Sequence, residues 1–139
     1  FNFDRIDFKF QIVRHPVDRL ISAYWYANRK KKEKSPFNFW WSQASTKLSE
    51  NPRAYDNHLL PQHCFEICGT AIYRFEEGIL QIARDVFNQI GQPFKRRNIG
   101  KKNEKPGAVV PRKLISRDSW AAIERVYKED FERYNYELE

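Results

Sequence analysis

The pattern of hydrophobic and polar positions changes its period near the start of the chain. From Phe8 to Val13, aromatic and β-branched side chains alternate with polar ones, and this period of two predicts a strand. Arg14 ends the apolar run. Pro16 suits the first position of a helix, and Asp18 would lie near the positive end of the helix dipole. We therefore predict a strand-to-helix unit with a cation at its joint.

The predicted helix has one apolar side. Its hydrophobic positions recur at helical spacing and are Val17, Leu20, Ile21 and Tyr24. This arrangement places Asp18, Ser22 and Trp25 along one flank, and it places Arg19 and Tyr26 on the opposite face. Arg14 and Ser22 therefore need not be buried.

Two further helices are predicted from breaks and periodicity. Ser35-Pro36 interrupts the chain before a short helix over about 37–49. Its aromatic residues could belong to the core or form a platform for a sugar, and the core is expected because they bury much apolar area. The last helix starts from Ser116 or Asp118 as N-cap. Its apolar face comprises Trp120, Ile123, Tyr127, Phe131 and Tyr134, with Val126 beside them.

A second strand and another helix lie between these two. The run from Ala71 to Phe75 is typical of a short strand, and Glu76 or Glu77 is expected to open a helix. Gly91 and Pro93 are expected to end it.

Length and composition indicate one globular domain. The chain has 139 residues, with 41% hydrophobic and 31% charged residues, and its longest apolar runs are too short to cross a bilayer. The net charge of +7 raises the local concentration of anionic ligands without deciding among nucleotide, sulfated glycan and nucleic acid. The basic run over 28–34 is expected to be a solvated helix end, and the basic stretch over 95–107 is expected to be a linker-like loop.

The two cysteines do not indicate a disulfide scaffold or a metal site. Cys64 and Cys68 lie four residues apart and lack the second ligand pair of a zinc site. His58 and His63 lack carboxylates or thiolates at ligand spacing. We therefore predict two buried structural thiols and no metal.

The joint before Pro16 has the chemistry of an anion site. A strand that runs into a helix N-terminus presents free backbone N–H groups, and Arg14 would add a bidentate donor for phosphate or sulfate. The alternative is an ordinary ion pair of Arg14 with Asp18 or Asp7, with Ser22 as a solvated helix residue.

The segment over 56–64 concentrates polar side chains and has few signals of regular structure. His58 is placed to accept a proton, since an imidazole titrates near neutrality. The alternative is a histidine held by hydrogen bonds in an ordered loop.

Three motifs, in order along the chain, resemble those of the carbohydrate sulfotransferases, the chondroitin and dermatan type in particular. The first is V-R-H-P-V-D-R-L-I-S-A-Y, which is similar to the family's 3′-phosphate motif. In that motif an Arg at a strand end and a Ser eight residues later hold the 3′-phosphate of 3′-phosphoadenosine 5′-phosphosulfate (PAPS). Arg14 and Ser22 match that spacing. D-N-H-L-L-P-Q resembles a segment on the acceptor side of the site, and Y-K-E-D-F-E-R-Y-N-Y resembles the family's terminal signature.

The resemblance implies an α/β fold. It would be part of a P-loop-NTPase-like, three-layer arrangement of parallel strands flanked by helices, with a helix-rich C-terminal part, formed by a single domain over residues 1–139. The family's earlier loop, which holds the 5′-phosphosulfate with a Lys and a Ser or Thr, has no counterpart in the sequence, because no G-x-x-x-x-G-K-S/T is present. The chain is therefore expected to be N-terminally incomplete and to lack the principal catalytic residues.

The resemblance also implies a function and site residues. It implies transfer of a sulfuryl group from PAPS to a carbohydrate hydroxyl, with Arg14 and Ser22 on the donor 3′-phosphate. Arg97 and Lys101 are further donor-binding candidates. His58 and Gln62 are acceptor-side candidates, and His58 is also a candidate for the base. No metal is implied.

The expected partners are a nucleotide donor and an acidic or sulfated glycan, with no nucleic acid. A microbial protein would be cytoplasmic, and an upstream anchor would place the domain in the Golgi lumen. Two alternatives remain open, namely a basic nucleic-acid-binding module and a catalytically inactive relative that binds glycans.

Overall fold

The computed structural model describes residues 8–95 and 110–138. The chain divides into two compact units. We call the unit of Phe1–Arg14 and Glu66–Lys105 the strand unit, and the unit of His15–Phe65 and Pro106–Glu139 the helical unit.

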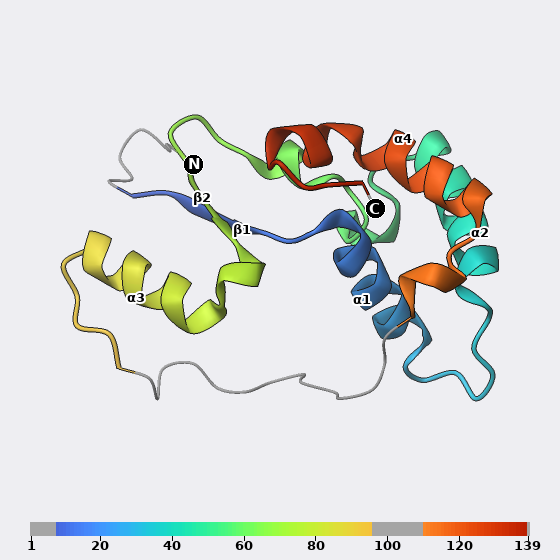
Figure 1. Ribbon diagram of the computed structural model, residues 1–139, viewed down its shortest axis with the longest axis horizontal. Coiled ribbons are helices and arrows are strands. Elements are labelled where there is room, and N and C mark those ends of the chain that lie inside the picture. The colour runs from blue at the N-terminus through green and yellow to red at the C-terminus, as the bar shows by residue number, and fades with distance from the viewer. Residues whose placement is uncertain (1–7, 96–109, 139) are drawn as a thin grey trace. The chain divides into compact units, whose positions relative to one another are not determined.

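A parallel pair of strands forms the sheet of the strand unit. β1 (Phe10–Val13) pairs with β2 (Ala71–Arg74), with Phe10 opposite Ala71 and Val13 opposite Arg74 (Figure 1). The rings of Phe10 and Tyr73 meet edge to face with their centroids 6.3 Å apart, a favourable aromatic geometry. Both strands predicted from the sequence are confirmed, although β1 begins two residues later than the alternation predicted.

The helix after β2 begins later than predicted. Glu76 and Glu77 lie in a 3₁₀ turn, η4 (Phe75–Glu77), and α3 covers Ile79–Gln89. Gly78 separates the two elements with a φ of 92°, a left-handed value that favours glycine. The prediction that Glu76 or Glu77 opens this helix is therefore wrong, because a glycine in this conformation interrupts the helical path.

Three longer helices form the helical unit. They are α1 (Pro16–Asn28), α2 (Phe37–Glu50) and α4 (Arg117–Arg133), accompanied by the 3₁₀ turns η2 (Ala54–Asn57), η3 (Gln62–Phe65) and η6 (Arg112–Leu114). The predicted helix starts are confirmed for α1, which has Pro16 at its first position, and for α4. The Ser116 side chain caps α4 by accepting a hydrogen bond from the Ser119 N–H at 3.2 Å.

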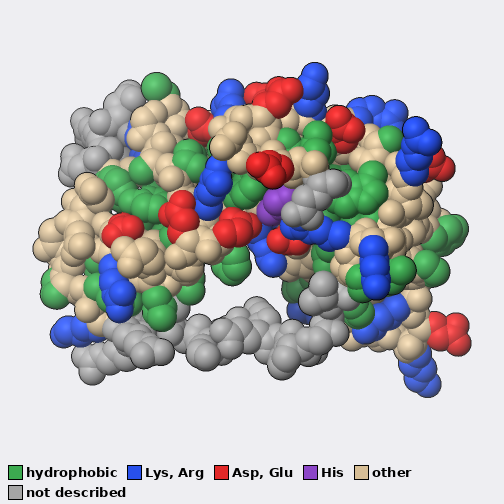
Figure 2. All heavy atoms as spheres, viewed as in Figure 1, with side chains coloured by type: hydrophobic (Ala, Val, Ile, Leu, Met, Phe, Trp, Pro, Cys, Tyr) green, Lys and Arg blue, Asp and Glu red, His purple; other side chains and the backbone are tan. Residues whose placement is uncertain are grey.

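Residues 29–34 of the basic run are exposed, as predicted, but they follow the end of α1 and do not form a helix end, and Asn28 at the start of the run is buried. Two of its cations lie over aromatic rings. The Arg29 guanidinium is 3.8 Å from the Tyr26 ring centroid, and the Lys34 ammonium is 4.1 Å from that of Trp25. On the face displayed in Figure 2, basic and acidic side chains are interspersed, so the positive charge is not gathered into one patch there.

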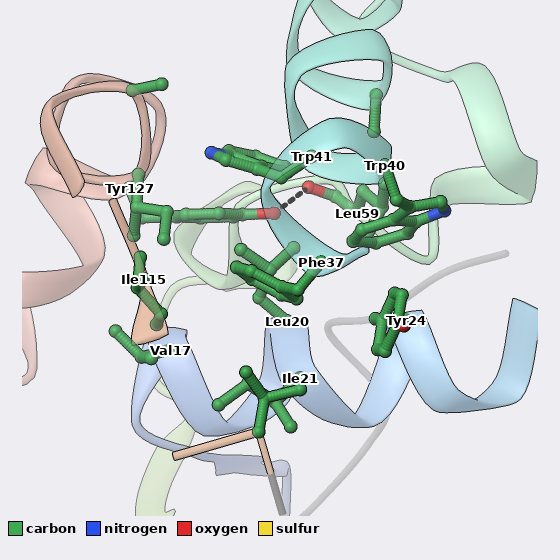
Figure 3. Packing of buried hydrophobic residues seen from close by; sticks show 14 of the residues in the cluster. Val17, Leu20, Ile21, Tyr24, Phe37, Trp40, Trp41, Leu59, Ile115 and Tyr127 are labelled. Carbon is green, nitrogen blue, oxygen red and sulfur yellow. Dashed lines mark hydrogen bonds between the residues drawn. The ribbon is translucent and has the colours of Figure 1, made fainter. Parts of the chain in front are cut away.

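A single buried cluster forms the core of the helical unit. Trp41 and Tyr127 stack with ring centroids 6.1 Å apart, and both are buried (Figure 3). Their polar atoms are satisfied, since Trp41 Nε1 donates to the Ser119 carbonyl at 3.2 Å and the Tyr127 hydroxyl donates to the Leu59 carbonyl at 2.9 Å. The cluster also includes Val17, Leu20, Ile21, Tyr24, Phe37, Trp40, Ala44, Ile115, Ile123 and Phe131.

The aromatic residues of α2 divide between core and surface. Phe37, Trp40 and Trp41 are buried, which confirms the prediction for these three. Phe39 is 56% exposed, so the prediction is wrong for it. Helical spacing explains the difference, because 37, 40, 41, 44 and 48 share one side of the helix and 39 does not.

The described residues therefore combine four α-helices with a two-stranded parallel sheet, which confirms the mixed α/β class. Within them, no helix has the length and hydrophobicity needed to span a membrane.

Candidate functional site

Arg14 lies directly after β1 in the strand unit. It is half-buried, and its guanidinium carbon is 5.0 Å from the centroid of the Phe75 ring, which follows β2. Because β1 and β2 are parallel, both residues lie at the carboxyl ends of their strands. This is the edge at which open parallel sheets bind their ligands. This cation–π contact restricts where the Arg14 guanidinium can point.

His15 caps the first turn of α1. Its Nδ1 accepts a hydrogen bond from the Val17 N–H at 3.2 Å, so the neutral ring carries its proton on Nε2, 3.3 Å from the Glu137 carbonyl. The ring also meets Phe131 and Tyr136 edge to face. One of the free N–H groups expected at this helix start is therefore already taken by a side chain that sequence reasoning did not select.

Asp18, in the same turn, pairs with a residue far away in the sequence. Its Oδ1 is 3.2 Å from a guanidinium nitrogen of Arg112 in η6. This pairing lies within the helical unit. An ion pair of Arg14 with Asp18 stays a prediction because the two residues fall in different units, and Asp7 lies outside the described residues.

Ser22 lies on α1 and is exposed, away from the buried side formed by Val17, Leu20 and Tyr24. Arg14 and Ser22 fall in different units, so their joint action stays a prediction. Arg97 and Lys101, the other donor-binding candidates, lie outside the described residues.

Arg19 connects α1 to the polar loop over 54–65. Its two terminal nitrogens donate to the carbonyls of Leu60 at 2.8 Å and of His58 at 3.0 Å. Tyr26 lies on the same side of α1, with its ring centroid 6.0 Å from that of His58. The α1 face that carries Arg19 and Tyr26 therefore supports this loop.

The loop itself has an unusual backbone. Tyr55, Asp56 and Asn57 have φ values of 62°, 51° and 62°, so three consecutive residues with side chains adopt left-handed conformations. Such conformations persist only where surrounding contacts hold them, and they concentrate at functional sites. His58 follows directly and its side chain is exposed, which is the placement that a residue acting on a ligand needs.

Asp130 of α4 holds the other end of the loop. Its carboxylate is fully buried and accepts hydrogen bonds from the backbone N–H groups of Gln62 at 2.7 Å and His63 at 2.9 Å. It also accepts from Nδ1 of His63 at 2.8 Å, which assigns a proton to that nitrogen. The motif match had identified Asp130 as part of a signature but not as the anchor of this loop.

Gln62 is buried, with 5% of its surface exposed. Of the two residues expected on the acceptor side, only His58 therefore presents its side chain at the surface of the helical unit.

Cys64 lies beside His63, with Sγ 3.4 Å from Nε2, and the same nitrogen is 3.3 Å from Oε2 of Glu129. Partial burial, with the nearby charges of Asp130 and Glu129, raises the pKa of the Cys64 thiol. A nucleophilic cysteine needs the opposite shift, so this thiol–imidazole–carboxylate series is poorly suited to attack. Both Cys64 and Cys68 are exposed, and the prediction of two buried thiols is wrong.

Within the described ranges, no three His, Cys, Asp or Glu side chains come together in a way that could hold a metal ion.

The chain was compared with known protein families, curated proteins and solved structures. The model of the sulfotransferase family matches residues 5–137, nearly the whole chain. No curated protein and no solved structure matches.

Proposed function

The chain belongs to the sulfotransferase family, and on that premise we propose that it transfers a sulfuryl group from PAPS to a carbohydrate hydroxyl, as enzymes of the chondroitin and dermatan type do. Arg14 and Ser22 bind the donor through its 3′-phosphate in this proposal, and Arg97 and Lys101 add positive charge. We further propose that β1 and β2 belong to a three-layer, P-loop-NTPase-like sheet.

The observation that carries the proposal is the position of the motif on the secondary structure. Arg14 follows the end of β1, and Ser22 is exposed on the helix that begins two residues later. An arginine suits a phosphate because its planar fork donates two parallel hydrogen bonds, and a serine hydroxyl adds another donor. Both residues act away from the reacting sulfur, so they govern donor affinity.

In the transfer, the acceptor hydroxyl oxygen attacks the sulfur while the bond from sulfur to the bridging oxygen of the phosphosulfate breaks. The proton of the hydroxyl passes to a base, and 3′,5′-adenosine bisphosphate leaves with the bridging oxygen. We propose His58 for the base because it is exposed and its loop is held by Arg19 and Asp130. Gln62, whose side chain is buried, keeps its acceptor-side assignment as a prediction.

A thermal-shift titration with 3′,5′-adenosine bisphosphate tests donor binding. A ligand at about a hundred times its Kd stabilises the folded chain by about 2.7 kcal/mol, and this stabilisation should disappear in Arg14→Ala and weaken in Ser22→Ala. Arg53→Ala and Ser42→Ala remove the same groups from exposed positions outside the motif and should respond like the wild type. Lack of stabilisation of the wild type by the bisphosphate would overturn the proposal.

A basic nucleic-acid-binding module is the second candidate. It is favoured by the exposed cations over 29–34, two of which lie on Tyr26 and Trp25, since such surfaces bind phosphates and stack on bases. Strongly salt-dependent oligonucleotide binding, together with indifference to the bisphosphate, would favour it.

A catalytically inactive glycan-binding relative would bind the bisphosphate or a glycan without turnover.

A further inference from the structure

A cavity of about 460 Å³ lies within the helical unit, lined by residues of α2 and α4 and of the chain between α2 and η3. Its apolar walls are Leu48 of α2, Val126 of α4, and the two prolines Pro52 and Pro61. Pro61 directly precedes Gln62, whose N–H group is bonded to the Asp130 carboxylate. One wall of the cavity is therefore fixed to α4 by the same anchor that holds the His58 loop.

Three hydroxyl groups of α2 line the cavity, and their protons are already used. Ser45 Oγ and Thr46 Oγ1 donate to the Ser42 carbonyl at 3.1 Å and 3.0 Å, and Ser49 Oγ donates to the Thr46 carbonyl at 2.6 Å. Each oxygen keeps lone pairs that can accept. A ligand that complements this wall must therefore bring hydrogen-bond donors, such as hydroxyl groups.

Arg125 of α4 contributes the only charge among the cavity-lining residues. Its side chain is exposed, and within the described part of the chain it makes no hydrogen bond or ion pair. Four other charged residues of α4 are paired, since Arg133 binds Glu129 at 3.2 Å and Lys128 binds Glu132 at 3.7 Å. The guanidinium of Arg125 is thus available for a carboxylate or sulfate of a ligand.

From these groups we propose that the cavity is a binding site for an acidic sugar unit of an oligosaccharide. The hydroxyls of the sugar donate to Ser45 and Ser49, its carboxylate or sulfate pairs with Arg125, and its C–H face packs on Pro52 and Pro61. This inference rests on the proposed function, because it assigns the cavity to a part of the acceptor glycan other than the reacting hydroxyl. It gives the enzyme a preference for acidic chains.

Titration calorimetry with a hyaluronan hexasaccharide tests the site, with maltohexaose as the neutral probe. Arg125→Gln should weaken binding of the acidic hexasaccharide about ten- to a hundredfold, the usual effect of losing a charge-assisted hydrogen bond. Arg125→Lys should restore part of it. Arg117→Gln is the matched control, since Arg117 is an exposed arginine of the same helix that does not line the cavity, and it should bind like the wild type. Maltohexaose should bind far more weakly to every variant.

The inference is overturned if Arg125→Gln binds the hexasaccharide like Arg117→Gln, or if maltohexaose binds equally well. The bisphosphate titration separates this failure from failure of the proposed function. If the bisphosphate stabilises the protein but hexasaccharide binding does not depend on Arg125, the cavity site is overturned and the proposed function stands. Arg125-dependent hexasaccharide binding without any bisphosphate stabilisation overturns the transferase and leaves the site as that of a glycan-binding protein.

Discussion

The Asp130 carboxylate lies 2.8 Å from Nδ1 of His63, a contact between residues 67 positions apart. With the two backbone hydrogen bonds that the same carboxylate accepts, it attaches α4 to the loop that carries the exposed His58. The loop therefore owes its conformation to a helix at the other end of the sequence.

Replacing Asp130 should destabilise the fold strongly. Asp130→Ala leaves the N–H groups of Gln62 and His63 without their acceptor, and each unsatisfied buried donor costs about 1–3 kcal/mol. We expect the free energy of unfolding in urea to fall by about 2–5 kcal/mol. Glu132→Ala, on the same helix but exposed, should change it by less than about 0.5 kcal/mol. Equal effects of the two substitutions would contradict the anchoring role.

Substitutions of the buried and the exposed aromatic residues of α2 should differ sharply in their effect on the free energy of unfolding. Trp41 is fully buried and stacked on Tyr127, so Trp41→Ala should cost about 3–5 kcal/mol of unfolding free energy. Phe39→Ala removes another large aromatic group, but from the exposed side, and should cost about 0.5 kcal/mol or less. Urea unfolding of both variants, followed by circular dichroism, measures the difference, and similar costs would refute the packing described for α2.

The burial of Tyr127 should make the fold less stable at alkaline pH. Burial raises the pKa of Tyr127, the Asp130 charge adds to this, and Arg19 lowers it. The folded state therefore keeps a proton that the unfolded state loses above about pH 10. The free energy of unfolding should fall as pH rises beyond that point, by up to about 1.4 kcal/mol per pH unit for this group. Tyr127→Phe should be less stable at neutral pH because the Leu59 carbonyl loses its donor, and it should show a shallower alkaline decline. An identical slope in both proteins would count against this origin.

The Cys64 thiol should react slowly for an exposed cysteine. Its raised pKa, caused first by partial burial and then by Asp130 and Glu129, lowers the thiolate fraction at neutral pH. In a Cys68→Ser background, which leaves one thiol, iodoacetamide should alkylate the native chain more slowly than the urea-unfolded chain, and the rates should converge at high pH. Faster reaction of the native thiol would instead indicate an activated cysteine.

Several features of the candidate site followed from local sequence. The position of Arg14 after a strand, the exposure of Ser22 and the start of α1 at Pro16 all follow from alternation, helical spacing and the fixed φ of proline. These signals act between neighbours in the chain, so a sequence displays them directly. Whether Arg14 and Ser22 act together on one phosphate stays a prediction.

Tertiary packing decided what local signals cannot express. His15 caps α1 and reaches a carbonyl 122 residues away. Arg19 binds a loop about 40 residues downstream, and Asp130 accepts a hydrogen bond from the backbone N–H of Gln62. The exposure of both cysteines was likewise visible only in the folded structure. The sequence by itself determined the strands, most helix limits and the family, because these depend on residues a few positions apart. Only the folded structure decided which polar groups are anchors and which remain available to a ligand, because burial and hydrogen-bond partners depend on how remote segments pack.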